Sequence, residues 1–131
     1  MTMIMDTIET LLTTAVNAAI GAGGEIMNVY DDPAQDFGIE LKADNSPLTK
    51  ADRRADAAIA AALQPTGISI LSEESAHAPY GERRHWERMW IVDPLDGTKE
   101  FIKKNGDFTV NIALAEGGTP VAGAIYVPAT R

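Results

Sequence analysis

The stretch WIVDPLDGTKEF, residues 90–101, decides the fold of this chain. Its first part is typical of an apolar strand, which we expect to end at Asp93 because Pro94 fixes φ at about −65° and turns the chain. Gly97 leaves room for another backbone segment to approach closely, and a short helix is expected from Thr98. The sequence therefore predicts a strand, a tight turn and a helix in direct succession.

Two carboxylates lie on this turn. Asp93 and Asp96 can both face one hard cation, with the carbonyl of Leu95 bent outward as a neutral ligand, and Mg²⁺ suits these oxygen donors better than zinc does. The N–H groups of Gly97 and Thr98 at the helix start would face a phosphate beside that cation. The alternative is that both aspartates only shape the turn, since Asp-Pro and Asp-Gly are common turn dipeptides.

Two further acidic residues are candidates for the same site. Glu73 directly follows an apolar strand and would supply a third carboxylate, although Glu73 and Glu74 together are also typical of a solvated surface. Asp52 is a candidate to orient the hydroxyl of Thr98, which can hold a water molecule. Asp52 can equally form a capping box with Thr49, and the two roles are compatible.

A basic and aromatic segment precedes the strand at residue 90. Three arginines beside a tryptophan can bind phosphates and bases, but on a polar loop they are also typical of a solvated face. We assign no ligand role to either histidine of this segment. Its members are His77, Arg83, Arg84, His85, Trp86 and Arg88.

Two helices are expected in the first half of the chain. Apolar residues recur every three or four positions over residues 4–30, which predicts a long amphipathic helix. Residues 31–46 are rich in Asp, Pro, Gly and Asn and are expected to form a mobile loop, with a strand or hairpin edge at 39–42. An Ala-rich second helix, capped by Thr49, is expected to run to about Gln64.

Three glycines interrupt the first predicted helix. Gly21, Gly23 and Gly24 begin like a dinucleotide-binding loop, but no strand precedes them and the third glycine is not at the required offset. We expect them instead to let another backbone segment pack closely against the helix.

Short strands fill the second half of the chain. They are expected at 68–71, 90–92, 108–115 and 121–127, and the last two are predicted to form an antiparallel hairpin around the Gly-rich turn at 116–119. Helices followed by strands indicate the α+β class, with the two helices packed on a largely antiparallel sheet.

Composition excludes several classes of protein. The 131 residues include 11 Lys and Arg against 19 Asp and Glu, a net charge of −8, which disfavours binding to a nucleic acid polymer or an anionic membrane surface. Cysteine is absent, which excludes disulfides and thiolate catalysis and suits a reducing cytoplasm. No apolar run is long enough to span a membrane and no signal peptide is evident.

Three segments in this order resemble the inositol monophosphatase superfamily of Mg²⁺-dependent, lithium-sensitive phosphatases. They are KADNSPLTKAD at 42–52, LSEES at 71–75 and DPLDGTKEF at 93–101. The Lys-Glu pair after Thr98 and the following NGDFTVN, residues 105–111, look like the bacterial CysQ branch, the 3′(2′),5′-bisphosphate nucleotidases. The resemblance implies a layered α+β sugar-phosphatase-like fold.

The resemblance also implies a role for each site residue. Glu73, Asp93 and the Leu95 carbonyl would hold one Mg²⁺, and Asp93 and Asp96 would share a second, with a third ion allowed per complete site. Glu73 and Thr98 would position the attacking water, with Asp52 supporting Thr98. Substrate contacts would come from the same turn and strand end. They are assigned to Glu73, Leu95, Asp96, Gly97 and Thr98.

The substrate implied is 3′-phosphoadenosine 5′-phosphate, hydrolysed to AMP and phosphate. Members of the superfamily are about twice this long and carry a further aspartate in a Trp-Asp motif, whereas neither Trp86 nor Trp90 is followed by Asp. We therefore expect residues 1–131 to be the N-terminal portion of such a phosphatase, without its C-terminal half and with doubtful activity alone.

Three points stay open from the sequence. The alternatives to a nucleotidase are an inositol or sugar monophosphatase, and a non-catalytic fragment that binds metal and phosphate. A homodimer is compatible with the resemblance. The expected location is the cytoplasm, with peripheral attachment to the cytoplasmic side of the inner membrane as an alternative.

Overall fold

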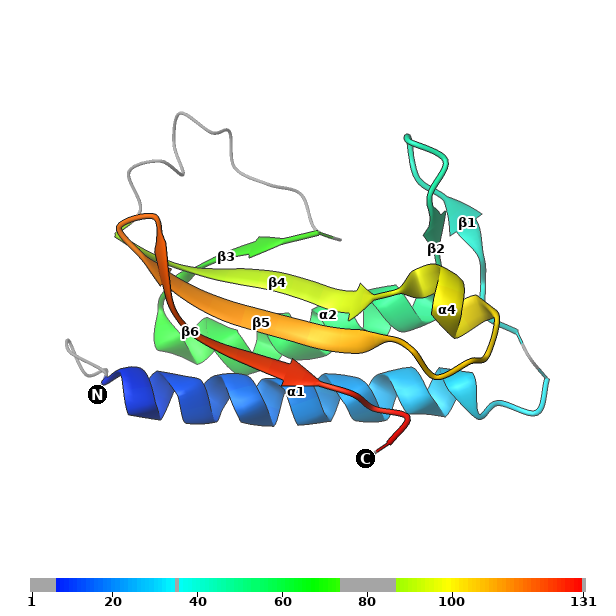
Figure 1. The fold of residues 1–131 in the computed structure, drawn as a ribbon, viewed down its shortest axis with the longest axis horizontal. Helices are drawn as coiled ribbons and strands as arrows, with labels where there is room; N and C mark the ends of the chain where they lie inside the picture. The colour runs from blue at the N-terminus through cyan, green and yellow to red at the C-terminus, as the bar shows by residue number, and fades with distance from the viewer. Residues whose placement is uncertain (1–6, 35, 74–86, 131) are drawn as a thin grey trace.

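The computed structural model describes residues 7–34, 36–73 and 87–130. In this part of the chain two long helices lie on the same side of a four-stranded sheet, and a small hairpin stands at one end (Figure 1). This arrangement confirms the α+β class. The elements in chain order are α1 (Ile8–Tyr30), β1 (Glu40–Leu41), β2 (Pro47–Leu48), α2 (Lys50–Leu63), the 3₁₀ turn η1 (Gln64–Thr66), β3 (Ser69–Ser72), β4 (Arg88–Asp96), α4 (Thr98–Ile102), β5 (Thr109–Glu116) and β6 (Thr119–Tyr126).

Both long helices begin at side-chain caps. The Thr7 side chain accepts a hydrogen bond from the N–H of Thr10 and starts α1, and residues 4–6 of the predicted helix lie outside the described part of the chain. Thr49 and Asp52 form the predicted capping box at the start of α2. No helix in the described ranges is long and apolar enough to cross a membrane.

The glycines of α1 only partly fit the expectation of close backbone packing. A Cβ at Gly23 would collide with the ring of Tyr126 on β6, so the close neighbour there is a side chain and not a backbone segment. A Cβ at Gly21 or Gly24 would meet nothing within 4 Å. The expectation is therefore wrong for these two positions, which face open space.

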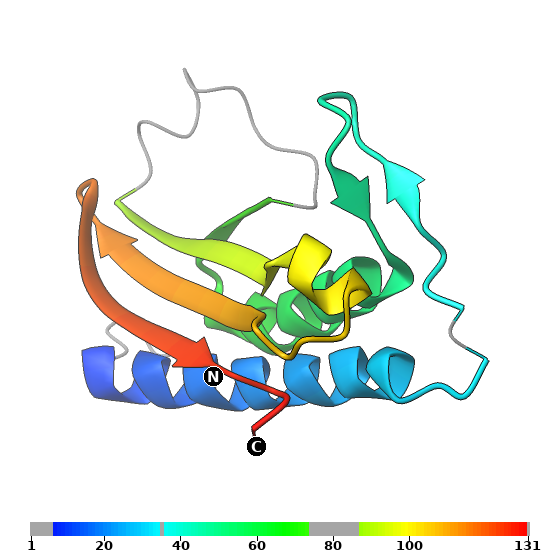
Figure 2. The same ribbon diagram turned by 45° about the vertical axis from the view of Figure 1, so that its right-hand side comes forward.

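The sheet has the order β3-β4-β5-β6. The pair β3–β4 is parallel, and β4–β5 and β5–β6 are antiparallel, so the prediction of a largely antiparallel sheet with a final hairpin is confirmed. The two helices cover one face and leave the other open (Figure 2). The largest side chains of the core between helices and sheet are fully buried: Leu11, Ile26, Ile59, Leu63, Trp90, Phe101, Phe108, Ile112 and Leu114.

The strand β4 is longer than predicted. We expected it to end at Asp93, but it continues to Asp96, which pairs with Thr109 on β5. The pairing shifts between Asp93 and Asp96, and Pro94 lies in this irregular part. A proline lacks an N–H donor and is tolerated in a sheet at such a bulge, so it bends the strand here instead of ending it.

The predicted loop at 31–46 contains one strand of the small hairpin. β1 pairs antiparallel with β2, which lies just before α2. At the tip, the Asp44 carboxylate accepts hydrogen bonds from the hydroxyl of Ser46 at 2.6 Å and from its N–H at 3.0 Å, and these bonds lower the pKa of Asp44. Asn45 takes a positive φ of 68°, as a tight turn requires.

Candidate active site

A pocket of about 260 Å³ lies where β3 and β4 end. The carboxyl ends of parallel strands meet at one edge of a sheet, which is the usual place for a binding site in such folds. Residues from β3, β4, α4 and the β1–β2 hairpin line the pocket. They are Lys42, Ser46, Pro47, Glu73, Asp93, Leu95, Asp96, Gly97, Thr98, Lys99 and Glu100.

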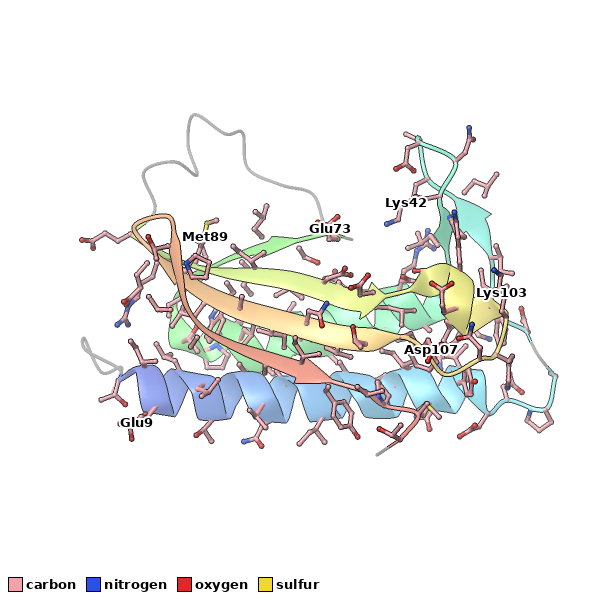
Figure 3. All side chains as sticks on the ribbon, in the orientation of Figure 1. Glu9, Lys42, Glu73, Met89, Lys103 and Asp107 are labelled. Atoms are coloured by element: carbon pink, nitrogen blue, oxygen red, sulfur yellow. The ribbon has the colours of Figure 1, made fainter. Side chains whose placement is uncertain are left out.

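Glu73 reaches the pocket because the end of β3 is fixed on both sides. The N–H of Glu73 donates to the carbonyl of Val92 at 3.1 Å, which extends the pairing with β4. The buried Ser72 hydroxyl donates to Asp56 Oδ1 on α2 at 2.5 Å. The Glu73 side chain is exposed, and Glu73 and Lys42 of the hairpin both lie on the side of the sheet away from α1 (Figure 3).

The bulge of β4 brings the next two carboxylates to the pocket. Asp93 is half-buried and Asp96 is exposed, while the Leu95 side chain between them is only 2% exposed and anchors the turn in the core. A buried side chain at this position holds the backbone of the turn, including the Leu95 carbonyl, in place. The structure thus brings Glu73, Asp93 and Asp96 around one pocket, as the sequence suggested.

The donor atoms of the pocket suit a hard cation, but they do not form a complete coordination site. Carboxylate and carbonyl oxygens are the ligands that Mg²⁺ prefers, and the pocket supplies both kinds. Within residues 7–34, 36–73 and 87–130, however, no three His, Cys, Asp or Glu side chains are grouped closely enough to hold a metal ion. The pocket therefore fits Mg²⁺ by the chemistry of its donors, and metal ligation by these residues stays a prediction.

Thr98 and Asp52 are hydrogen-bonded to each other. The Thr98 hydroxyl donates to Asp52 Oδ1 at 2.9 Å, and Oδ2 of the same carboxylate accepts from the N–H of Thr49 at 2.8 Å and from its hydroxyl at 2.7 Å. Asp52 is 0% exposed, so these three donors replace the water that it loses on burial. Asp52 therefore makes both of the expected contacts: it caps α2, and it accepts a hydrogen bond from the hydroxyl of Thr98.

Gly97 is required by the shape of the turn. Its φ is +96°, and an added Cβ would lie 2.9 Å from the carbonyl oxygen of Asp107. The expected close approach of another backbone segment is therefore present. The helix α4 that follows has only five residues, so the N–H groups of Gly97 and Thr98 carry little of the dipole of a long helix.

A cluster of aromatic rings holds α4 against the rest of the fold. Phe101 of α4 packs against Tyr30, Phe37 and Phe108, with ring centroids 4.9–5.5 Å apart. These rings come from α1, from the segment before β1 and from the loop before β5. The cluster ties the turn at 93–98 to three other parts of the chain and so fixes the position of Thr98.

Three charged residues of the pocket were not predicted to belong to the site. Lys42 lies at the end of the hairpin strand β1, and Lys99 and Glu100 lie on α4. Their signal was their place in the motifs KADNSP and DGTKEF, from which the Lys-Glu pair was used only to choose the branch of the superfamily. Both lysines bring positive charge to a wall that otherwise carries four carboxylates.

The basic segment before β4 is mostly outside the described residues. This holds for His77, Arg83, Arg84, His85 and Trp86, and also for Glu74 beside the site. Arg88 is described, and its Nε donates to Glu116 Oε2 at 2.5 Å across the β4–β5 pair. The contact joins two strands of the sheet and lies away from the residues that line the pocket.

Known proteins share both the sequence and the fold. The 3′(2′),5′-bisphosphate nucleotidase CysQ of Salmonella typhimurium is 48% identical over 123 residues, which are 92% of this chain and 49% of that protein. The crystal structure of CysQ from Bacteroides thetaiotaomicron superposes with a TM-score of 0.80 at 54% identity, over 92% of this chain and 43% of that one. The extragenic suppressor protein suhB from Bartonella henselae gives 0.81 at 34% identity, over 92% and 46%.

The chain spans about half the length of the curated relatives it matches. The sequence also matches the inositol monophosphatase family over residues 7–131, which include every residue of the pocket. The segments at 42–52, 71–75 and 93–101 that carry the resemblance all fall inside this range, and the superposed structures share the fold. On this evidence the chain belongs to the inositol monophosphatase family.

Proposed function

We propose that this chain forms part of a Mg²⁺-dependent phosphomonoesterase that hydrolyses 3′-phosphoadenosine 5′-phosphate to AMP and phosphate. The observation that carries the proposal is the meeting of Glu73, Asp93 and Asp96 with Thr98 around one pocket. The similarity to proteins named bisphosphate nucleotidase supports the choice of substrate. The proposed location is the cytoplasm, whose reducing conditions suit a chain without cysteine.

The residues of the chain would share the work as follows. Glu73, Asp93 and the Leu95 carbonyl would hold one Mg²⁺, and Asp93 and Asp96 would share a second. Bound Mg²⁺ supplies Lewis-acid chemistry, since it makes a water molecule more acidic and stabilises the oxygen that leaves. Cations held by the carboxylates would offset their negative charge. A protein with a net negative charge could then bind and hydrolyse a negatively charged substrate.

Thr98 and Glu73 would orient the attacking water. The single hydroxyl proton of Thr98 is donated to Asp52 Oδ1, so the lone pairs of the hydroxyl oxygen remain able to accept a hydrogen bond from water. Asp52 is fixed by Thr49 and therefore holds the Thr98 hydroxyl in one orientation. Gly97 and Thr98 would offer N–H groups to the phosphate, and no covalent nucleophile is needed.

Two other functions fit parts of these observations. The match to the inositol monophosphatase family supports an inositol or sugar monophosphatase as an alternative. A second alternative is a non-catalytic module that binds metal and phosphate in the same pocket. Phosphate release from 3′-phosphoadenosine 5′-phosphate and from inositol 1-phosphate, with calorimetry of Mg²⁺ and AMP binding, separates the three. Turnover of the bisphosphate supports the proposal, preference for inositol phosphate overturns the substrate, and binding without turnover supports the module.

Asp93→Asn tests the site directly. The substitution keeps the size of the side chain but removes the charge that would be shared by both cations, so phosphate release should fall by about 100-fold or more. Asp107→Asn is the matched control, because Asp107 is exposed and does not line the pocket. Full turnover by Asp93→Asn would contradict the proposed site.

A further inference from the structure

Asn111 on β5 lies between the two carboxylates of the turn. It is the cross-strand partner of Asp93, and its Nδ2 donates a hydrogen bond to Asp96 Oδ2 at 3.1 Å. Its own carbonyl oxygen, Oδ1, accepts from the hydroxyl of Thr109 at 3.1 Å. One amide therefore links β5 to the site through Asp96 while it faces Asp93.

The bulge of β4 makes this arrangement possible. In a regular strand, residues three positions apart point to opposite faces, so Asp93 and Asp96 could not both lie near one side chain of β5. The shift in pairing puts Asp93 opposite Asn111 and Asp96 opposite Thr109, two residues apart on the same side of β5. The side chain of Asn111 then extends along β5 toward Thr109 and so reaches Asp96, which is paired with Thr109.

The orientation of the amide follows from its two partners. The carboxylate of Asp96 can only accept, so the NH₂ group must face it, and the carbonyl oxygen is left for the Thr109 hydroxyl. An amide donor holds one carboxylate oxygen without neutralising its charge, whereas a lysine or arginine there would compete with a cation. No donor of the described residues contacts Asp96 Oδ1, the second oxygen.

We propose that Asn111 is a positioning residue, which fixes Asp96 by its Oδ2 and leaves Oδ1 to bind a divalent cation, and that Thr109 fixes Asn111 in turn. The proposal rests on the proposed function only in requiring a cation at this pocket. Removing a residue that hydrogen-bonds to a metal ligand typically changes the metal affinity by about 10- to 100-fold.

The test measures metal affinity and not activity. Mn²⁺, a spectroscopic substitute for Mg²⁺, is titrated into the chain and its variants by electron paramagnetic resonance, without substrate. Asn111→Leu keeps the branched shape and the number of side-chain heavy atoms but has no donor, and its Kd should rise by about 10-fold or more. Thr109→Val should raise it less, Asn111→Gln should recover part of the loss, and Asn28→Leu, an exposed change on α1, should leave the Kd unchanged.

A second measurement needs no metal at all. In the metal-free chain, the side-chain NH₂ signals of Asn111 in a ¹⁵N NMR spectrum should move in Asp96→Ala and in Thr109→Val, because each change removes one hydrogen-bond partner. If Asn111→Leu does not fold, Asn111→Ser replaces it in the titration, since a serine is too short to reach Asp96.

Three results would overturn the proposal: a Kd in folded Asn111→Leu equal to that of the unchanged chain, NH₂ signals insensitive to Asp96→Ala, or no Mn²⁺ binding by the unchanged chain. Failure of the proposed function looks different. In that case the metal titrations behave as expected, but neither phosphate ester is hydrolysed.

Discussion

The two faces of the four-stranded sheet carry alternate residues of the same strands, yet they differ in almost every property. On β4, Trp90 and Val92 are each 1% exposed beneath the helices, whereas Ile91 between them is 38% exposed on the other side. On β6 of the open face, Ile125 is 75% exposed. The covered face is packed as a protein core, and the open face forms a groove of about 430 Å³.

The difference shows that the residues that stabilise the fold and the residues of the candidate site lie on opposite faces of the sheet. Asp93 and Asn111 lie on the open groove together with Glu73, while their sequence neighbours Val92 and Ile112 are in the core. A period of two residues along each strand produces this separation. Changes on the covered face should therefore act on stability, and changes on the open face should leave stability almost untouched.

The largest effect on stability is expected at Ile112, which is 1% exposed in the centre of the covered face. Ile112→Ala removes buried methyl and methylene groups and leaves a cavity, so the free energy of unfolding should fall by about 2–5 kcal/mol. Urea denaturation followed by circular dichroism measures the change. A loss below about 1 kcal/mol would mean that the core collapses readily around the site and is not tightly packed.

Local sequence signals predicted the helices well, and the motifs of the resemblance predicted the contact of Asp52 with Thr98. The Thr49–Asp52 capping box depends on residues three positions apart, so its spacing can be read from the sequence. The hydrogen bond from Thr98 to Asp52 spans 46 positions, and it was anticipated because both side chains belong to the motifs that carried the resemblance. The fold class and the final hairpin also followed from local patterns, namely the periodicity of apolar residues and the position of turn residues.

What the sequence did not predict depends on the pairing of distant strands. A proline after Asp93 suggested the end of a strand, because nothing local indicates that β5 continues to pair as far as Asp96. Asn111 could not be connected with Asp96 until this shifted pairing was known. The parallel pairing of β3 with β4, which puts Glu73 beside Asp93, is likewise a property of the sheet as a whole.

An intermediate effect is expected at Gly97, which lies between the end of β4 and the start of α4. Gly97→Ala puts a Cβ on a residue with φ of +96° and 2.9 Å from the Asp107 carbonyl oxygen, so unfolding should require roughly 1–3 kcal/mol less. Thermal denaturation gives the change. Gly117→Ala is the control, because its φ of +57° is also positive but an added Cβ meets nothing within 4 Å. Equal losses in both variants would show that the backbone angle alone matters, and not the close approach.

The smallest effect on stability is expected at Ile125, the counterpart of Ile112 on the open face. Ile125→Ala removes the same atoms as Ile112→Ala, but from a side chain that is 75% exposed, so the free energy of unfolding should change by no more than about 0.5 kcal/mol. Both variants are measured in the same urea titration, which makes them a matched pair. A loss at Ile125 comparable to that at Ile112 would mean that the open face is covered in solution, and the contrast between the two faces would not hold. If instead only Ile112 is sensitive, the apolar groove contributes little to the stability of this chain, and its side chains can vary without loss of the fold that supports the pocket.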